Sequence, residues 1–226
     1  MPNGDPARDR SYLEPYERAV DDLGPGFEAQ LWRSQDAQHR RFRVIARALG
    51  PSPGVVADLG SGTGDLAAHL HEAGHAPERF IGVEGVERMT AHAREIADAR
   101  GVTEAVFETH DFVADPALAA TLVEDAGASA FVFSGSLNTL PMNHAQRVLE
   151  PFWDALARSG RGRLIFNFLS ERHDEDRTPA SPPAVRFDPV AMLDWALTRT
   201  PLVRLLHDYL GGHDATIVMR VPSAAD

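Results

Sequence analysis

Three glycines follow a short apolar run at alternate positions in VADLGSGTGDL, residues 56–66. The apolar run ends on Asp58, and Gly60, Gly62 and Gly64 come next. Glycine carries no side chain, so a glycine-rich turn lets the backbone approach a ligand closely. An apolar run before the turn and a helical pattern after it predict a strand-to-helix junction, where helix N–H groups also face the ligand. The pattern therefore indicates a ligand-binding turn rather than a plain tight turn.

Two acidic residues follow the next two apolar runs. Glu84 ends RFIGVE, and Asp111 follows EAVFETH. A carboxylate at Glu84 can accept hydrogen bonds from both hydroxyls of a ribose, and Asp111 can accept one from an adenine amino group. The glycine spacing is G-x-G-x-G, which differs from the G-x-G-x-x-G fingerprint of dinucleotide-binding folds. These residues indicate a nucleoside-containing ligand at the carboxyl ends of adjacent strands.

Strand and helix patterns alternate from residue 55 to residue 200, which predicts right-handed βαβ units and a mainly parallel sheet with helices on both faces. Two strand patterns then flank a Gly-Gly turn near the C-terminus, which predicts an antiparallel hairpin. The expected strands are 55–59, 79–85, 104–112, 129–136, 162–169, 202–210 and 214–221, and the expected helices between them are 65–74, 87–101, 116–127, 144–160 and 190–200.

The first part of the chain has a different pattern. Residues 1–53 are expected to form a loose tail and a helical cap, with two helices between Tyr12 and Leu49 that either cover the site or only pack against the fold. Residues 54–226 are expected to form a single compact ligand-binding unit. The charged and Pro-rich stretch 171–189 is predicted to be a surface loop or lid.

Composition excludes several kinds of chemistry. The 226 residues include no Cys and no Lys, and all 22 basic residues are Arg. Thiolate metal sites, Cys nucleophiles, Schiff-base lysines and Walker A loops are therefore excluded. A net charge of −11 argues against nucleic acid as a partner. The one basic run, HRRFRVIAR at 39–47, is interpreted as the solvated face of an amphipathic helix.

Three further features of the sequence give no evidence for another function. The start is polar and the apolar runs are short, so we expect no membrane span and a cytoplasmic location. HEAGH at 71–75 matches a zinc-protease pattern, but Gly74 is expected to end the helix inside it, so we predict no metal site. Three tryptophans in helical patterns are predicted to be core residues, Trp32, Trp153 and Trp195.

The motif Asp58-x-Gly60-x-Gly62-x-Gly64, with Glu84 and Asp111-Phe112 after it, resembles the cofactor motifs of class I S-adenosylmethionine-dependent methyltransferases. VFSGSLNTL and HDYLGGHDATIVMR are also similar to bacterial members of that family. The resemblance covers roughly residues 54–221 and implies a Rossmann-like, seven-stranded α/β sheet. It implies S-adenosylmethionine as cofactor and a small-molecule acceptor. The cofactor-binding residues that it implies are Asp58, Gly60, Ser61, Gly62, Gly64, Glu84, Gly85, Asp111, Phe112, Ser134 and Gly135.

Methyl transfer to an acceptor that must lose a proton needs a base, and imidazole suits that task near neutral pH. The candidates expected near the carboxyl edge of the sheet are His110, Asn138, His144, Asn167, His173, His207, Asp208, Tyr209 and His213. We select His213, Tyr209 and Asn138 as candidate catalytic residues, because the turn HDYLGGHD should lie at the same edge as the glycine turn.

Three other functions compete with this hypothesis. An aminopropyl transferase would share the fold and the nucleoside site. A nucleoside-binding module would share the site without catalysis. A nicotinamide dehydrogenase is disfavoured by the glycine spacing and the terminal hairpin. The sequence leaves the acceptor molecule, the acceptor atom and the oligomeric state open.

Overall fold

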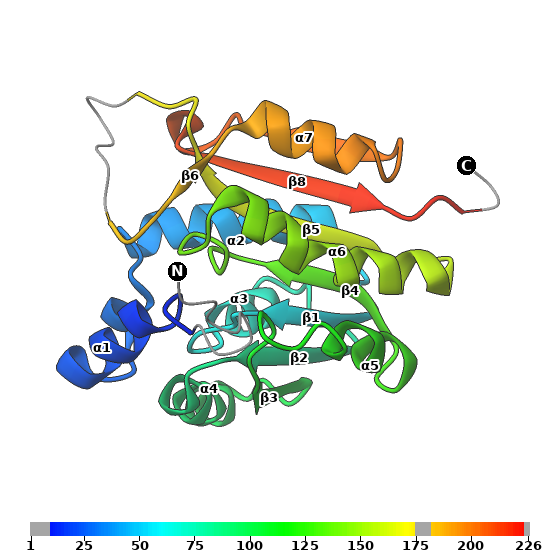
Figure 1. The fold of residues 1–226 in the computed structure, drawn as a ribbon. Helices are drawn as coiled ribbons and strands as arrows, with labels where there is room; N and C mark the ends of the chain where they lie inside the picture. Colours follow the sequence, from blue (N-terminus) through cyan, green and yellow to red (C-terminus); the bar gives the residue numbers. More distant parts are fainter. Residues whose placement is uncertain (1–9, 175–181, 224–226) are drawn as a thin grey trace.

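The computed structural model describes residues 10–174 and 182–223, which fold around one mixed sheet (Figure 1). Its main strands lie in the order β3-β2-β1-β4-β5-β8-β7. The strand bounds are β1 Val55–Leu59, β2 Arg79–Glu84, β3 Ala105–Thr109, β4 Ala128–Phe133, β5 Arg163–Ser170, β6 Arg186–Phe187, β7 Val203–Leu206 and β8 Asp214–Arg220. Strands β1 to β5 run parallel, so their carboxyl ends meet at one edge.

The terminal hairpin is present as the sequence predicts. Strand β8 lies antiparallel between β5 and β7, with Leu169 opposite Asp214. The connection between β7 and β8 is longer than a two-residue turn and contains a short 3-10 helix, η2, at Leu210–Gly212. Because β8 begins where β5 ends, the residues just before it lie at the carboxyl edge of the parallel strands.

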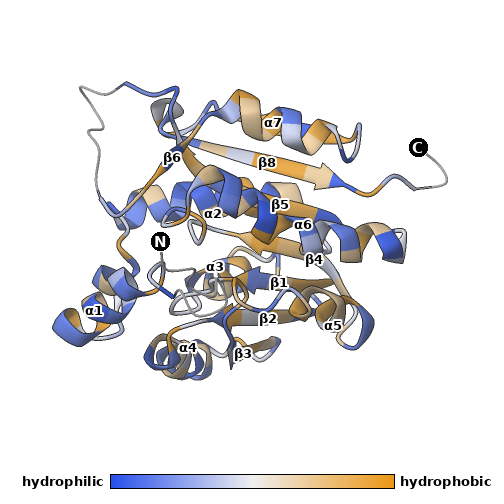
Figure 2. Cartoon of the chain, in the orientation of Figure 1, coloured by the Kyte–Doolittle hydropathy of each residue, from blue (hydrophilic) through white to orange (hydrophobic). Residues whose placement is uncertain are grey.

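Helices cover both faces of the sheet because alternate strand residues point to opposite sides. In β4, Phe131 and Phe133 belong to one core and Ala130 and Val132 to the other. The first core is completed by α5 (Leu118–Glu124), α6 (Met142–Ser159) and α7 (Pro189–Leu197). The second is completed by α2 (Gln35–Leu49), α3 (Asp65–Glu72) and α4 (Glu87–Arg100). Figure 2 shows the apolar strands between helices with mixed surfaces.

A small N-terminal unit lies beside one end of the sheet (Figure 1). It contains α1 (Glu14–Leu23) and the 3-10 helix η1 (Phe27–Gln30), separated at Gly24. Val20 of α1 and Ala29 of η1 share a minor core with Met89 of α4. Helix α2 then begins after Ser34, whose hydroxyl accepts a hydrogen bond from the backbone N–H of Ala37. We call residues 10–34, which contain α1, η1 and the connection to α2, the cap.

The stretch predicted to be a loop or lid is partly described. Its end forms the short strand β6, which pairs with the end of β5 and which the sequence pattern did not predict. Residues 175–181 lie outside the described residues, so the lid hypothesis remains a prediction.

Candidate active site

A cavity of about 790 Å³ lies where the glycine turn, the cap and the ends of β4 and β5 meet. Its wall includes most of the residues that the sequence selected for the cofactor: Asp58, Gly60, Ser61, Gly62, Glu84, Gly85, Asp111, Phe112, Ser134 and Gly135. Asn138 and His213 also line it. Ligand sites of parallel sheets lie at this edge, and the volume is in the range of small-molecule pockets.

A residue of the cap, Gln30, lies against the glycine turn. At Gly62, a Cβ atom would lie 2.7 Å from the side-chain oxygen of Gln30, and the backbone φ is +54°. The Gln30 amide nitrogen donates to Thr63 Oγ1 and to Asp65 Oδ2, each at 2.7 Å. The absence of a side chain at Gly62 therefore lets a cap residue approach the turn, in addition to any ligand.

Glu84 joins the second strand to the glycine turn. Its Oε2 accepts a hydrogen bond from the Gly62 N–H, and its Oε1 accepts one from the Val86 N–H, each at 2.9 Å. Burial raises the pKa of this carboxyl, and the two backbone N–H groups partly offset that effect. A carboxylate has about four acceptor positions, so acceptor capacity remains for the two hydroxyls of a ribose.

Asp58 is a second buried acid at the same end of the cavity. Its side chain is 2% exposed, and its Oδ1 has no hydrogen-bond partner among the described residues. Burial, followed by the charge of Glu84, raises the pKa of Asp58 to about 8. A bound cation would favour the ionised form of this carboxyl. This end of the cavity therefore suits a positively charged ligand.

Asp111 connects the end of β3 to the cap. Both of its carboxylate oxygens lie 2.8 Å from the Tyr12 hydroxyl, and Arg10 Nε lies 3.2 Å from Oδ2. The backbone N–H groups of Val113 and Ala114 also donate to Oδ1, each at 3.2 Å. The role that the sequence gave Asp111, acceptance from an adenine amino group, remains a prediction, and the structure adds a contact with the cap.

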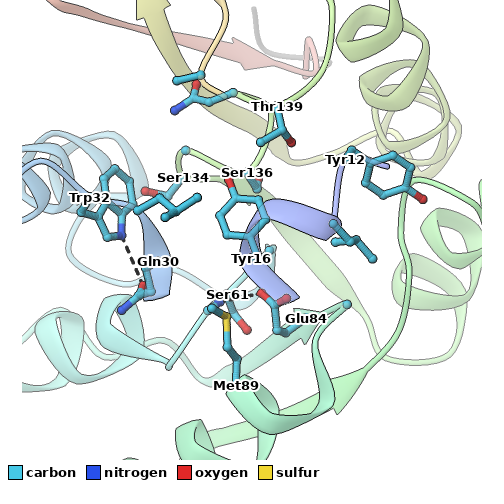
Figure 3. A pocket seen from close by; sticks show the side chains of 18 of the residues that line it. Tyr12, Tyr16, Gln30, Trp32, Ser61, Glu84, Met89, Ser134, Ser136 and Thr139 are labelled. Atoms are coloured by element: carbon cyan, nitrogen blue, oxygen red, sulfur yellow. Dashed lines mark hydrogen bonds between the residues drawn. The ribbon is translucent and has the colours of Figure 1, made fainter. Parts of the chain in front are cut away.

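Aromatic side chains of the cap reach into the cavity. Figure 3 shows Tyr16 in the middle of the view, Trp32 and Gln30 on one side and Glu84 on another. Burial and the charge of Glu84 raise the pKa of the Tyr16 hydroxyl to about 12, so it stays protonated at neutral pH. Trp32 was expected in the core, and that prediction is wrong: it follows η1 rather than lying in a helix, and it lines the cavity. Trp153 is buried in the main core as predicted.

The turn after β4 forms a further part of the cavity wall, and its Ser136 lies against Gly60 of the glycine turn. Gly135 N–H donates to Asn167 Oδ1 at 2.7 Å, which fixes the turn after β4. A Cβ atom at Gly135 would lie 2.5 Å from the Trp32 ring, so the cap closes over this turn as well. Asn138 Oδ1 and Ser136 Oγ are buried without a hydrogen-bond partner among the described residues. Polar atoms of this kind are usually satisfied by a ligand or by water.

Two residues chosen from the sequence do not line the cavity. The Tyr209 hydroxyl and Thr216 Oγ1 share a hydrogen bond of 2.7 Å. Burial raises the pKa of the Tyr209 hydroxyl. Gly64 begins α3 with its backbone against the Phe107 ring, where a Cβ atom would lie 2.8 Å from the ring. Gly64 therefore serves helix packing, and we carry neither residue into the reaction.

The basic run on α2 is only partly a solvated face, because Arg41 is an exception. Arg41 is 3% exposed, lines the cavity and donates from Nε to Asp214 Oδ1 at 2.6 Å. The sequence analysis missed both residues of this pair. The helical pattern around Arg41 and Phe42 describes only neighbouring residues. It cannot indicate an acidic partner at the start of β8.

The remaining histidine candidates have structural contacts. His110 pairs with Asp115, His207 contacts the carbonyl of Gly212, and His144 packs edge-on against Tyr12. Helix α3 ends at Glu72, so His71 and His75 do not share a helix face as a zinc-protease motif requires. Within residues 10–174 and 182–223, no group of three or more His, Asp or Glu side chains is placed to hold a metal ion.

Comparison with known proteins gives a match for the central part of the chain. Residues 56–160 match a family model described as a methyltransferase domain. The match contains the glycine turn, Glu84, Asp111 and the turn after β4. A comparison with curated protein sequences gives no match.

Solved structures resemble this chain over most of its length. A structure described as a DhpI–SAH complex has a TM-score of 0.60 at 17% identity, with 95% of this chain and 96% of that chain covered. The S-adenosylmethionine-dependent methyltransferase SibL, solved in its apo form, has a TM-score of 0.63 at 17% identity over 92% of this chain and 62% of that chain. A SAM-dependent methyltransferase from Aquifex aeolicus has a TM-score of 0.58 at 13% identity, over 84% of this chain and 94% of that chain.

These likenesses confirm the predicted α/β architecture, which is the class I methyltransferase fold. The neighbours include structures described as complexes with SAH and with SAM, the cofactor that the sequence predicts. The residues present fit that molecule, because Asp58 Oδ1, Ser61 Oγ and Ser134 Oγ are buried polar atoms on the cavity wall without partners among the described residues. In the part of the chain that the structure describes, no helix has the length and apolar character that a membrane crossing requires.

Proposed function

We propose that this protein transfers the methyl group of S-adenosylmethionine to a small-molecule acceptor. The observation that carries the proposal is the cavity itself, with two buried acids and the glycine turn at one end and Asn138 and His213 also on its wall. A concave, partly apolar cavity of this kind suits small ligands. The net charge of −11 disfavours nucleic acid as the acceptor, and we propose that the protein acts in the cytoplasm.

The cofactor end would hold the molecule through three contacts. Asp58 and the turn at Gly60–Gly62 would receive the methionine part, where the Asp58 carboxylate balances positive charge. Glu84 would accept from the ribose hydroxyls, and Asp111 with Phe112 would lie at the base. When bound, S-adenosylmethionine supplies an electrophilic methyl group, which bonds to the acceptor as the methyl–sulfur bond breaks and its electron pair stays on sulfur.

The protein's own contribution is positioning and exclusion of water. The cap covers both the glycine turn, through Gln30, and the turn after β4, through Trp32. Removing water from a methyl-transfer site strengthens the electrostatic interactions within it. Contacts with the cavity wall hold the reactants in line. Asn138 would offer a hydrogen bond to the acceptor, since its buried side-chain oxygen has no partner among the described residues.

The test is S-adenosylhomocysteine release by purified protein against a metabolite library, with nucleic acid and protein substrates as separate arms. We expect release with members of the small-molecule arm and a large loss in Asp58→Asn. Asp98→Asn, which changes an exposed acid on α4, is the matched control and should behave as wild type. Aminopropyl transfer or binding without turnover would contradict the proposal, as would activity confined to the macromolecular arms.

A further inference from the structure

A buried ion pair joins α2 to the start of β8. Arg41 Nε lies 2.6 Å from Asp214 Oδ1, and the two side chains are 3% and 1% exposed. The Trp32 ring covers the guanidinium, with its centroid 4.6 Å from Arg41 Cζ. A buried ion pair adds little stability over apolar residues of the same size, because desolvation offsets the attraction. The position of this pair beside the cavity therefore suggests a role besides stability.

Asp214 uses its second oxygen to hold His213. His213 Nδ1 lies 2.7 Å from Asp214 Oδ2. Burial alone would raise the pKa of Asp214, but the hydrogen bond from His213 and the charge of Arg41 outweigh burial and keep that pKa below its usual value. An ionised carboxylate can only accept hydrogen bonds. Nδ1 must therefore carry the proton, which leaves Nε2 as the acceptor nitrogen of the neutral ring.

The backbone around His213 is fixed as well. Its carbonyl accepts from the Ser170 N–H at 2.9 Å and from Arg186 Nη1 at 3.4 Å, and its N–H donates to the Leu210 carbonyl at 3.2 Å. His213 lines the cavity, whereas Asp214 does not. The imidazole is thus held in one tautomer. Hydrogen bonds fix the backbone of His213, and Asp214 fixes its Nδ1. This is the arrangement that a general base requires.

We propose that Asp214 and Arg41 are positioning residues that hold His213 as a general base, so that the acceptor presents a proton-bearing oxygen or nitrogen, a hydroxyl or a protonated amine. This inference rests on the proposed function. His213 Nε2 takes the acceptor proton, and the electron pair left on the oxygen or nitrogen forms the bond to the methyl carbon. The Asp214 carboxylate balances the imidazolium that results. Acceptors with no proton to lose, such as thioethers and tertiary amines, would gain nothing from this base.

The first test reads the tautomer by nitrogen NMR of histidine-labelled protein, without acceptor or cofactor. His213→Gln assigns the signal by removing it. We expect Nδ1 protonated and Nε2 unprotonated in the neutral ring of wild-type His213. In Asp214→Asn, the new amide offers one oxygen and one NH₂ group. Arg41 can only donate hydrogen bonds, so the amide oxygen faces Arg41 and the NH₂ group faces His213 Nδ1. The proton should then move to Nε2.

The matched control is Asp208→Asn, which makes the same change on an exposed side chain of the same loop and should leave the tautomer as in wild type. An Nε2-protonated ring in wild type would overturn the positioning role, and this measurement stands even if Asp214→Asn fails to fold. An unchanged tautomer in a folded Asp214→Asn protein would also overturn it.

The second test is turnover with an acceptor from the library. His213→Gln and Asp214→Asn should each lower turnover by about a hundredfold or more, as expected for loss of a general base, while cofactor affinity stays within about twofold. Equal turnover in these variants, or a preferred acceptor without a proton on its reacting atom, would contradict the inference. Absence of methyl transfer to any acceptor would instead count against the proposed function, and the NMR result would still decide the positioning role.

Discussion

Glu84 has two neighbours that only donate, the backbone N–H groups of Gly62 and Val86. In Glu84→Gln, the amide NH₂ must face one of these donors, and the charged acceptor for the ribose is lost. We expect S-adenosylmethionine affinity to fall about tenfold or more, equivalent to about 1.5–3 kcal/mol. Calorimetric titration measures this loss. Glu87→Gln, on the exposed first turn of α4, is the control, and equal affinity in the two variants would remove Glu84 from the site.

Arg41 and Asp214 make a stability prediction that is independent of catalysis. Arg41→Ala leaves the Asp214 carboxylate buried without its cation, which should lower the free energy of unfolding by about 3–5 kcal/mol. Arg18→Ala breaks the ion pair with Glu14, whose side chains are 72% and 55% exposed, and should cost about 0–1 kcal/mol. Urea unfolding at neutral pH compares the two. Equal losses would mean that the buried pair has no special energetic role.

At the scale of elements, the cap is held to the rest of the fold by side-chain contacts, among them the hydrogen bonds from Gln30 to Thr63 and Asp65. The Tyr12 hydroxyl donates to Asp111 at the end of β3, and the minor core of Val20, Ala29 and Met89 is small. Segments with few buried apolar contacts open more readily than the main core. We therefore expect the cap to open more readily than the main core.

Tyr12→Phe removes the hydroxyl and keeps the ring, so it isolates this attachment. We expect amide hydrogen exchange in α1 to become faster by about tenfold, since a hydrogen bond to a charged group has been lost. Tyr209→Phe, which breaks the bond to Thr216 elsewhere in the fold, should leave exchange in α1 unchanged. Exchange in α1 that is as slow in Tyr12→Phe as in wild type would show that other contacts hold the cap.

For the whole molecule, Asp58 links stability to pH. Its pKa of about 8 lies above the ordinary value of 3.8, so between these values the folded protein holds a proton that the unfolded chain has lost. The contribution of Asp58 to stability therefore falls as pH rises through this range. Asp58→Asn cannot titrate and should gain stability relative to wild type as pH increases. Urea unfolding of both proteins at several pH values measures the difference, and a constant difference would contradict the raised pKa.

Local patterns in the sequence predicted most of the fold and many of the residues that line the cavity. Strand periodicity placed Asp58, Glu84 and Asp111 at strand ends, and a parallel sheet brings such ends together. Arg41 could not be found this way, because its partner Asp214 lies 173 residues further along the chain. His213 and Tyr209 occupy the same turn, yet only His213 lines the cavity. The backbone between them has positive φ angles at Leu210, Gly211 and Gly212, and alternation along the sequence does not encode such a turn.

The most direct test of the central claim is a calorimetric titration of the wild-type protein with S-adenosylmethionine, compared with NADH under the same conditions. The glycine turn, the buried acids Asp58 and Glu84 and the class I methyltransferase fold predict saturable one-to-one binding of S-adenosylmethionine and no binding of NADH. Binding of NADH, or no heat with S-adenosylmethionine at concentrations that saturate such sites, would contradict the account.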